Sequence, residues 1–286
     1  MFARILTGAI LIPLVVALVW FAPPLVLAAV AALVSALALV EFFNLGERLG
    51  AKPFRKWTLV CATALFYAQY SLGSVETKSL GGGALFVHNS MGGVLSIEAV
   101  LLIFLFGAVV IGLAMPGAVQ EVLPSVSASS AALLFVALPF SYVARINEIP
   151  LIGRRLVLYT LSLIWAGDTL AYFVGRSLGR VPMAPVISPK KTWEGALGNI
   201  FGSLLVAVAF ARWMGVDVIN MMIIAALGNV AGQVGDLIES AFKRGASVMD
   251  SGTLLPGHGG MYDRIDSLIL AAPVVWAACH WLLAPR

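Results

Sequence analysis

The sequence predicts an all-α, polytopic integral membrane protein with about nine transmembrane helices. Of its 286 residues, 60% are hydrophobic and only 11% are charged, and the mean hydropathy is +0.98. Soluble domains usually carry about twice that charged fraction. The apolar residues also occur in runs of roughly 20, the length that crosses a bilayer. Because the backbone within lipid must satisfy its own hydrogen bonds, we expect these runs to be helices.

The nine expected spans are residues 5–21, 25–43, 57–72, 94–115, 129–143, 156–174, 197–213, 218–238 and 268–283. The first span could be read as a signal peptide, but no small-x-small cleavage pattern follows it, and Pro23 and Pro24 lead directly into the second. We therefore expect it to be retained. Cys61 and Cys279 fall inside spans and fit small apolar packing residues.

The distribution of basic residues favours a cytoplasmic N-terminus. That orientation places twelve of the 18 Lys and Arg residues inside: Arg4, Arg48, Lys52, Arg55, Lys56, Arg176, Arg180, Lys190, Lys191, Lys243, Arg244 and Arg264. Positive residues accumulate in cytoplasmic loops of membrane proteins. The segment from Arg145 to Arg155 runs against the rule. We interpret the net charge of +4 as a topology signal and expect no nucleic-acid partner.

We expect a single membrane domain, residues 1–286, with its polar content concentrated in the second half. Residues 1–115 would form scaffold helices, because their spans are almost featureless. Residues 165–286 would form the catalytic helices and loops, because most carboxylates and bases that interrupt apolar sequence lie there.

The eighth span carries a polar stripe. Its members are Asn229, Gln233, Asp236, Ser240 and Lys243, spaced at steps of 4, 3, 4 and 3. This spacing places all five on one helix face. A hydrogen-bonded seam between helices would explain Asn229 and Gln233 alone. It explains Asp236 poorly, because a carboxylate at membrane depth is costly unless paired and usually marks a functional site.

The loop that follows, residues 245–261, combines glycines with flanking carboxylates. Gly259 and Gly260 allow close approach to a ligand, and their N–H groups suit an anion. Asp263 and Asp266 are three residues apart and could hold one cation together with Asp236, because carboxylates are ligands that Mg²⁺ prefers. Compensation of a helix N-terminus would explain one of the two. His258 fits a loop hydrogen bond, a phosphate contact or a proton carrier.

Two further segments carry charge next to apolar spans. Lys190 and Lys191 can neutralise phosphates, or they can simply anchor the topology. Ser188 or Thr192 could cap the helix that follows, whose N-terminus favours anions. In the sixth span, Asp168 and Tyr172 lie one helical turn apart. Asp168 fits either a structural ion pair, for example with Arg176, or a contact to nucleotide or metal.

Together these segments resemble the phosphatidate cytidylyltransferase (CDP-diacylglycerol synthase) family. The resemblance covers roughly residues 168–266. It rests on Asp168-Thr169-x-Ala171-Tyr172, Ser188-Pro189-Lys190-Lys191-Thr192, Gly235-Asp236-Leu237-x-Glu239-Ser240, Lys243-Arg244, and Pro256-Gly257-His258-Gly259-Gly260 with Asp263-Arg264-Ile265-Asp266. The family usually has Lys directly before Asp250, where this chain has Met249. A phosphate-facing cation is therefore missing unless another base replaces it.

The resemblance implies transfer of a cytidylyl group from CTP to phosphatidate at a bacterial-type inner (plasma) membrane, with the active-site loops in the cytoplasm. It implies Mg²⁺, with or without a second cation, held by Asp236 and Asp263, and Asp266 as a third carboxylate. The implied catalytic and substrate-binding residues also include Lys243, Arg264, His258, Asp168, Tyr172, Ser188, Lys190, Lys191, Ser240, Arg244, Gly259 and Gly260. A homodimer through the N-terminal helices is a hypothesis that no sequence feature tests.

Three alternatives remain open from the sequence. A related CTP-using membrane enzyme could act on another lipid phosphate or on an isoprenoid alcohol. A cation-coupled transporter would also place Asp residues within the membrane, but it predicts internal inverted repeats, and no repeat is evident. A non-catalytic relative is suggested only by Met249.

Overall fold

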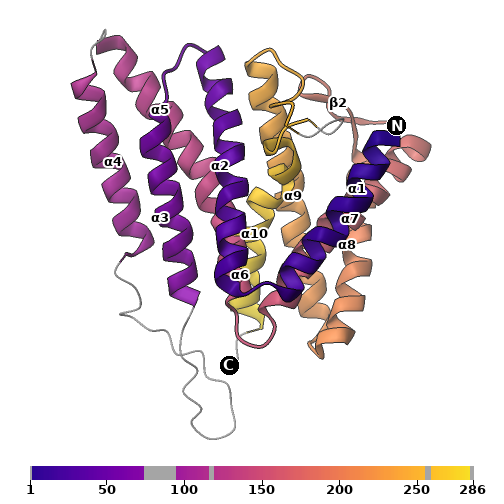
Figure 1. Ribbon diagram of the computed structural model, residues 1–286. Helices are drawn as coiled ribbons and strands as arrows, with labels where there is room; N and C mark the ends of the chain where they lie inside the picture. The colour runs from indigo at the N-terminus through magenta and orange to yellow at the C-terminus, as the bar shows by residue number, and fades with distance from the viewer. Residues whose placement is uncertain (1, 74–94, 116–118, 255–258, 284–286) are drawn as a thin grey trace, which may run out of the picture.

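Long helices stand side by side in the computed structural model, and a short β-hairpin projects at one end of them (Figure 1). The structure describes residues 2–73, 95–115, 119–254 and 259–283, with side chains described from Gly8 onward. The helices are α1 (Phe2–Phe21), α2 (Pro24–Arg48), α3 (Arg55–Gly73), α4 (Ile97–Ala114), the 3₁₀ turn η1 (Val119–Glu121), α5 (Val122–Ala132), the π-helical turn η2 (Leu133–Ala137), α6 (Leu138–Asn147), α7 (Gly153–Leu178), α8 (Trp193–Met214), α9 (Val218–Gly245) and α10 (Tyr262–Leu282). The predicted all-α membrane fold is confirmed.

The expected number of nine spans is not confirmed. Within the described residues, seven helical stretches are long and apolar enough to cross a membrane: α2, α4, the continuous stretch Val119–Asn147, α7, α8, α9 and α10. In α1, the described apolar part Gly8–Phe21 is shorter. α3 does not qualify, and polar residues such as Lys56 and Gln69 lower its hydropathy.

The fifth expected span is longer than its sequence pattern suggests. α5, η2 and α6 follow one another without interruption, so the helical stretch runs from Val119 to Asn147 instead of residues 129–143. The π-helical turn sits where the two α-helical segments join. A π-turn inserts one extra residue into a helix without ending it.

Side-chain caps mark three helix starts. Ser96 accepts a hydrogen bond from Ala99 N at the start of α4, and Thr192 accepts one from Gly195 N at the start of α8. Asp217 does the same for Asn220 N at the start of α9. Each cap satisfies an N–H group that has no partner within its helix. Of the two candidates for α8, the structure therefore selects Thr192.

The C-terminal helices pack closely in two pairs, α7 with α8 and α9 with α10. Gly202 of α8 faces the backbone of α7: a Cβ there would lie 2.7 Å from the carbonyl oxygen of Ala166. Gly235 of α9 faces the backbone of α10 in the same way: a Cβ there would lie 2.5 Å from the carbonyl oxygen of Asp266. Small residues let the backbones of membrane helices approach closely. The resulting van der Waals packing stabilises helix association in lipid, where the hydrophobic effect does not drive it.

The sequence did not predict the hairpin. β1 (Pro182–Ala184) pairs antiparallel with β2 (Ser188–Thr192), with Pro182 opposite Thr192 and Ala184 opposite Ser188. Arg244, at the end of α9, donates to the carbonyl of Ile187 and so ties the hairpin to that end of the bundle. The hairpin thus stands beside the C-terminal end of α9 (Figure 1).

Candidate active site

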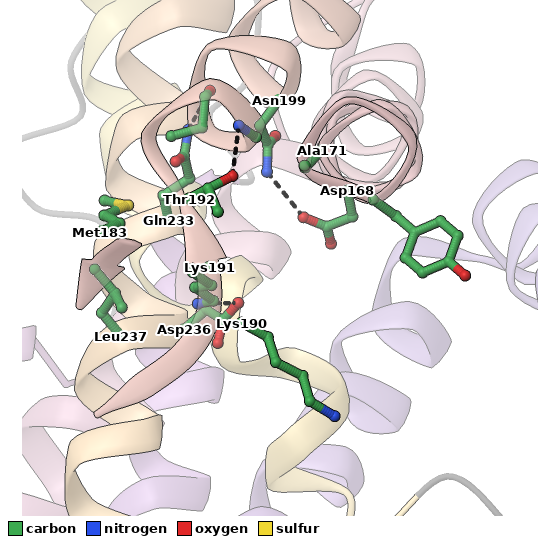
Figure 2. Close-up of a pocket in the computed structure, with 14 residues that line it drawn as sticks. Asp168, Ala171, Met183, Lys190, Lys191, Thr192, Asn199, Gln233, Asp236 and Leu237 are labelled. Carbon is green, nitrogen blue, oxygen red and sulfur yellow. Dashed lines mark hydrogen bonds and ion pairs between the residues drawn. The ribbon is translucent and has the colours of Figure 1, made fainter. Parts of the chain in front are cut away.

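A cavity of about 270 Å³ opens between α7, the hairpin, α8 and α9 (Figure 2). Its lining residues are Asp168, Ala171, Tyr172 and Gly175 of α7, Met183 of β1, Lys190, Lys191 and Thr192 of β2, Gly195, Ala196 and Asn199 of α8, and Gln233, Asp236 and Leu237 of α9. The structure therefore brings together five of the predicted site residues: Asp168, Tyr172, Lys190, Lys191 and Asp236. They come from segments up to 68 positions apart in the sequence but share one cavity.

Asp168 is held by a relay of side-chain amides. Asn199 Nδ2 donates to Asp168 Oδ1 over 3.1 Å. Asn229 Nδ2 donates in turn to Asn199 Oδ1, and Gln233 Nε2 donates to Asn229 Oδ1 over 2.7 Å. Asn229 and Gln233 thus form the interhelical seam that was one interpretation of the stripe. Because this seam continues through Asn199 to Asp168, it also fixes the orientation of a carboxylate that lines the cavity.

Lys191 and Asp236 form an ion pair at the cavity wall. Their Nζ and Oδ2 atoms are 2.6 Å apart, and both side chains remain about 30% exposed. Figure 2 shows this pair, with the exposed side chain of Lys190 extending away from it. An ion pair that is partly exposed to solvent contributes little net stability, so either residue can leave the other and bind a charged ligand at small cost. The cavity thus offers both a base for phosphate and a carboxylate for a cation.

A cluster of three carboxylates borders the cavity. Ligand oxygens of Asp236, Glu239 and Asp266 lie within 4.8 Å of one another, and Asp236 also lines the cavity. Glu239 is only 1% exposed. Its Oε1 lies 2.7 Å from Lys243 Nζ, while its Oε2 has no hydrogen-bond partner among the described residues. An unpartnered buried carboxylate oxygen beside two further carboxylates fits a site for a divalent cation.

Asp263 lies outside that cluster and is occupied by protein donors. Its Oδ1 lies 2.6 Å from Lys243 Nζ. Its Oδ2 accepts from Gly260 N at 2.7 Å, from Ser251 N at 3.1 Å and from Ser251 Oγ at 2.9 Å. Asp263 therefore orients Lys243 and compensates the start of α10, which was the other interpretation of an Asp at this position. Glu239, which the sequence analysis quoted within a motif but gave no role, stands in the cluster, three residues after Asp236.

The remaining predicted residues lie around this end of the bundle. Arg264 is exposed at the first turn of α10, and Ser240 is buried in α9. Arg244 donates to the carbonyls of Ile187 and Val248, and Ser188 is half-buried in β2. Gly259 has φ +75° and faces Asp263, while Met249 is 76% exposed. His258 lies outside the described residues.

Sequence reasoning missed Glu41 of α2. Its carboxylate accepts hydrogen bonds from Ser251 Oγ at 2.8 Å, Met261 N at 2.9 Å and Tyr262 N at 2.8 Å. These partners are 210 or more positions away in the sequence. An acid inside an otherwise apolar span was the available signal, the same one that drew attention to Asp168 and Asp236.

Comparison with known proteins places the chain in a family. The model of the cytidylyltransferase family matches residues 2–282. The phosphatidate cytidylyltransferase of Bacillus subtilis is 40% identical over 147 residues, which are 51% of this chain and 55% of that protein. The phosphatidate cytidylyltransferase of Haemophilus influenzae is 45% identical over 130 residues, which are 43% of this chain and 45% of that protein. The one of Staphylococcus aureus is 44% identical over 128 residues, which are 43% of this chain and 48% of that protein.

This chain belongs to the cytidylyltransferase family, because the match extends over nearly its whole length. The alignments span about half the length of the curated relatives.

Proposed function

We propose that this protein transfers the cytidylyl group of CTP to phosphatidate, giving CDP-diacylglycerol and pyrophosphate. Its family membership supports nucleotidyl transfer, and the names of its relatives support this acceptor. The observation that carries the proposal is the shared position of Asp236. This one carboxylate lines the cavity, pairs with Lys191 and belongs to the three-carboxylate cluster.

The proposed reaction needs charge neutralisation more than it needs a strong base. An oxygen of the phosphatidate phosphate, already ionised at neutral pH, attacks the α-phosphorus of CTP. The bond from that phosphorus to the oxygen bridging to the β-phosphate breaks, and pyrophosphate leaves with the electron pair. Two polyanions must meet, so positioning and offsetting of charge supply most of the catalysis.

Asp236, Glu239 and Asp266 would hold a divalent cation, for which we propose Mg²⁺. The unpartnered Oε2 of Glu239 and the mutual closeness of the three acids support this assignment. When bound, the cation would neutralise charge on the phosphates of CTP. In this proposal Asp263 is not a direct ligand, because its carboxylate is engaged by Lys243, Ser251 and Gly260.

The other cavity residues would bind and orient the nucleotide. Lys191 would release Asp236 and move onto a phosphate, and the exposed Lys190 would add a second positive charge. Asp168, fixed by Asn199, would accept hydrogen bonds from the nucleotide. The N-terminus of α8, which opens at the same cavity, favours anions through its aligned peptide dipoles.

We propose that the end of the bundle that carries the hairpin faces the cytoplasm. The positive-inside rule supports this, since most bases lie in the segments at that end. Arg154, by contrast, donates to the carbonyls of Trp20 and Ala22 at the opposite end. With this orientation the cavity meets soluble CTP, and the acyl chains of the acceptor stay in the bilayer beside it.

Acceptor specificity tests the proposal. Detergent-purified protein is incubated with Mg²⁺, CTP labelled either at the α-phosphate or, in a parallel reaction, at the γ-phosphate, and one acceptor at a time: phosphatidate, diacylglycerol or a long isoprenoid alcohol. We expect lipid-soluble α-label with phosphatidate only, no γ-label in the lipid, and no lipid-soluble label after addition of EDTA. Label with the isoprenoid alcohol instead, or with no acceptor, would contradict the proposal.

A further inference from the structure

Glu41 is a buried acid in the half of the chain that otherwise lacks site residues. It lies seven positions before the end of α2 and is 7% exposed. Within the described part of the chain no ion pair reaches it; the five ion pairs there join other residues. A buried carboxylate without a counter-ion costs several kcal/mol unless hydrogen bonds replace its water.

The start of α10 supplies that compensation. Glu41 Oε1 accepts from Met261 N, and Oε2 accepts from Tyr262 N, the first residue of the helix. Met261, at the cap position, provides no side-chain hydrogen bond of its own. The first N–H groups of a helix have no partner within it and carry partial positive charge. Glu41 therefore acts as the N-terminal cap of α10 from a different helix.

Two glycines before α10, Gly252 and Gly260, lie against the Glu41 carboxyl group. A Cβ on Gly252 would lie 2.6 Å from Glu41 Oε1, and Gly260 leaves even less room beside Oε2. A side chain at either position would therefore have to displace the Glu41 carboxyl group. Two glycines thus allow the backbone to close on the acid from two sides.

The groups that hold Glu41 also hold Asp263. Ser251 Oγ lies 2.8 Å from Glu41 Oε2 and 2.9 Å from Asp263 Oδ2, and its single proton can be donated to only one of them at a time. Gly260, packed against Glu41, donates its N–H to Asp263. Asp263 pairs with Lys243, which pairs with Glu239 of the carboxylate cluster. A continuous chain of contacts therefore links α2 to the proposed cation site.

We propose that Glu41 is a positioning residue for the nucleotide site: it holds Ser251, Met261 and Tyr262 in place, and through Ser251 and Asp263 it sets Lys243 and Glu239. This inference rests on the proposed function, because it takes the cluster and the cavity to be the site for Mg²⁺ and CTP. It assigns one residue of the N-terminal half to the performance of that site. The alternative is that Glu41 only joins α2 to α10 and has no effect on the nucleotide site.

Substitution by glutamine separates these roles. Glu41→Gln keeps the size of the side chain, but whichever way its amide turns, an NH₂ group faces one of the backbone N–H donors. We expect the KM for Mg²⁺–CTP to rise at least about tenfold, because partners behind a metal site typically contribute 10–100-fold. The matched control is Glu47→Gln on the same helix, whose side chain is 47% exposed and pairs with Arg55; its KM should not change.

Three results decide between the roles when the wild-type protein is active. A folded Glu41→Gln protein with a raised KM supports positioning. A folded Glu41→Gln protein with the wild-type KM overturns the positioning role. A change in apparent kcat does not bear on this result, because a smaller fraction of folded protein lowers kcat per milligram without changing the KM. If Glu41→Gln aggregates in size-exclusion chromatography, Ser251→Ala replaces it. We expect Ser251→Ala to raise the KM at least about threefold. An unchanged KM, or aggregation of this variant too, would overturn the proposal.

Direct binding distinguishes failure of this inference from failure of the proposed function. Radiolabelled CTP with Mg²⁺ is equilibrated with each protein in the absence of lipid. If the wild-type protein binds CTP but labels no lipid, the proposed function fails on its own, and weaker binding by Glu41→Gln still supports positioning. Equal binding by wild type and Glu41→Gln overturns positioning. A wild-type protein that binds no CTP would overturn both.

Discussion

The first four helices and the last four differ in what their polar residues do. In α7–α10, polar side chains on neighbouring helices contact one another: Asn229 reaches Asn199, and Lys243 reaches Asp263. In α1–α4, by contrast, Arg55 links α3 to Glu47 and Asn44 of α2 through exposed side chains, and Trp57 donates to the carbonyl of Phe104 in α4. None of these residues lines the cavity. Buried polar groups that meet at one cavity can build a site, whereas scattered links between helices only join them.

Glu41 is the exception that connects the two regions. We had expected residues 1–115 to be scaffold and residues 165–286 to be catalytic. We now propose that the division holds for most of the N-terminal helices but not for the end of α2, where Glu41 contacts the segment before α10.

Loss of a cluster carboxylate should have the largest effect. Asp266→Asn removes one negative charge from the proposed cation site, and we expect kcat/KM for CTP to fall about a thousandfold, the upper range for a charge-stabilising group. The control is Asp217→Asn, which keeps a side-chain cap at the opposite end of α9 and should retain wild-type activity. Activity of Asp266→Asn within tenfold of wild type would remove the cluster from the account.

The second effect comes from a base in the cavity. Lys191→Gln leaves Asp236 without its partner and removes a charge for phosphate, so kcat/KM for CTP should fall about a hundredfold. Lys52→Gln breaks an exposed ion pair with Glu121 in the N-terminal half and should change activity less than about twofold. Equal losses in the two variants would mean that charge near the membrane surface matters more than the cavity.

Two helix caps test whether stability and function separate. Ser96→Ala and Thr192→Ala each remove the cap of one helix and should lower the free energy of unfolding by about 1 kcal/mol. Only Thr192 lines the cavity, so only Thr192→Ala should also raise the KM for CTP. Thermal unfolding in detergent measures the first quantity and steady-state kinetics the second. A raised KM in Ser96→Ala would break the comparison.

The smallest effect should come from Met249. Its side chain is 76% exposed, and the family usually has Lys here. Met249→Lys adds an exposed charge, which is worth at most about 1 kcal/mol, so kcat/KM for CTP should change by less than about fivefold. A gain of a hundredfold would show that the missing base limits this enzyme and that Lys190 and Lys191 do not replace it.

The fold was largely predictable because a bilayer restricts the choice of structure. Long apolar runs must be helices in lipid, and they are. The hairpin was not predictable from that rule, since Pro182–Thr192 connects two spans outside the apolar stretches. The predicted number of nine spans was not confirmed, in part because α3 combines helical length with polar residues such as Gln69.

The site was predictable where the signal is local. Asp168, Lys191 and Asp236 each interrupt or flank an apolar run, and the structure places all three on one cavity. Which acids share a cluster depends on the rotation of α9 against α10, and spacing alone did not distinguish Asp263 from Glu239. Glu41 depends on a contact over 210 or more positions, which helical periodicity does not reveal.

The fate of each phosphate of CTP tests the central claim most directly. Wild-type protein is given phosphatidate, Mg²⁺ and CTP labelled either at the α-phosphate or at the γ-phosphate, and lipid and water phases are counted separately. Cytidylyl transfer predicts α-label in the lipid and γ-label in water as pyrophosphate. γ-Label in the lipid would mean that a phosphoryl group is transferred instead, and α-label that never leaves the water phase would mean that phosphatidate is not the acceptor.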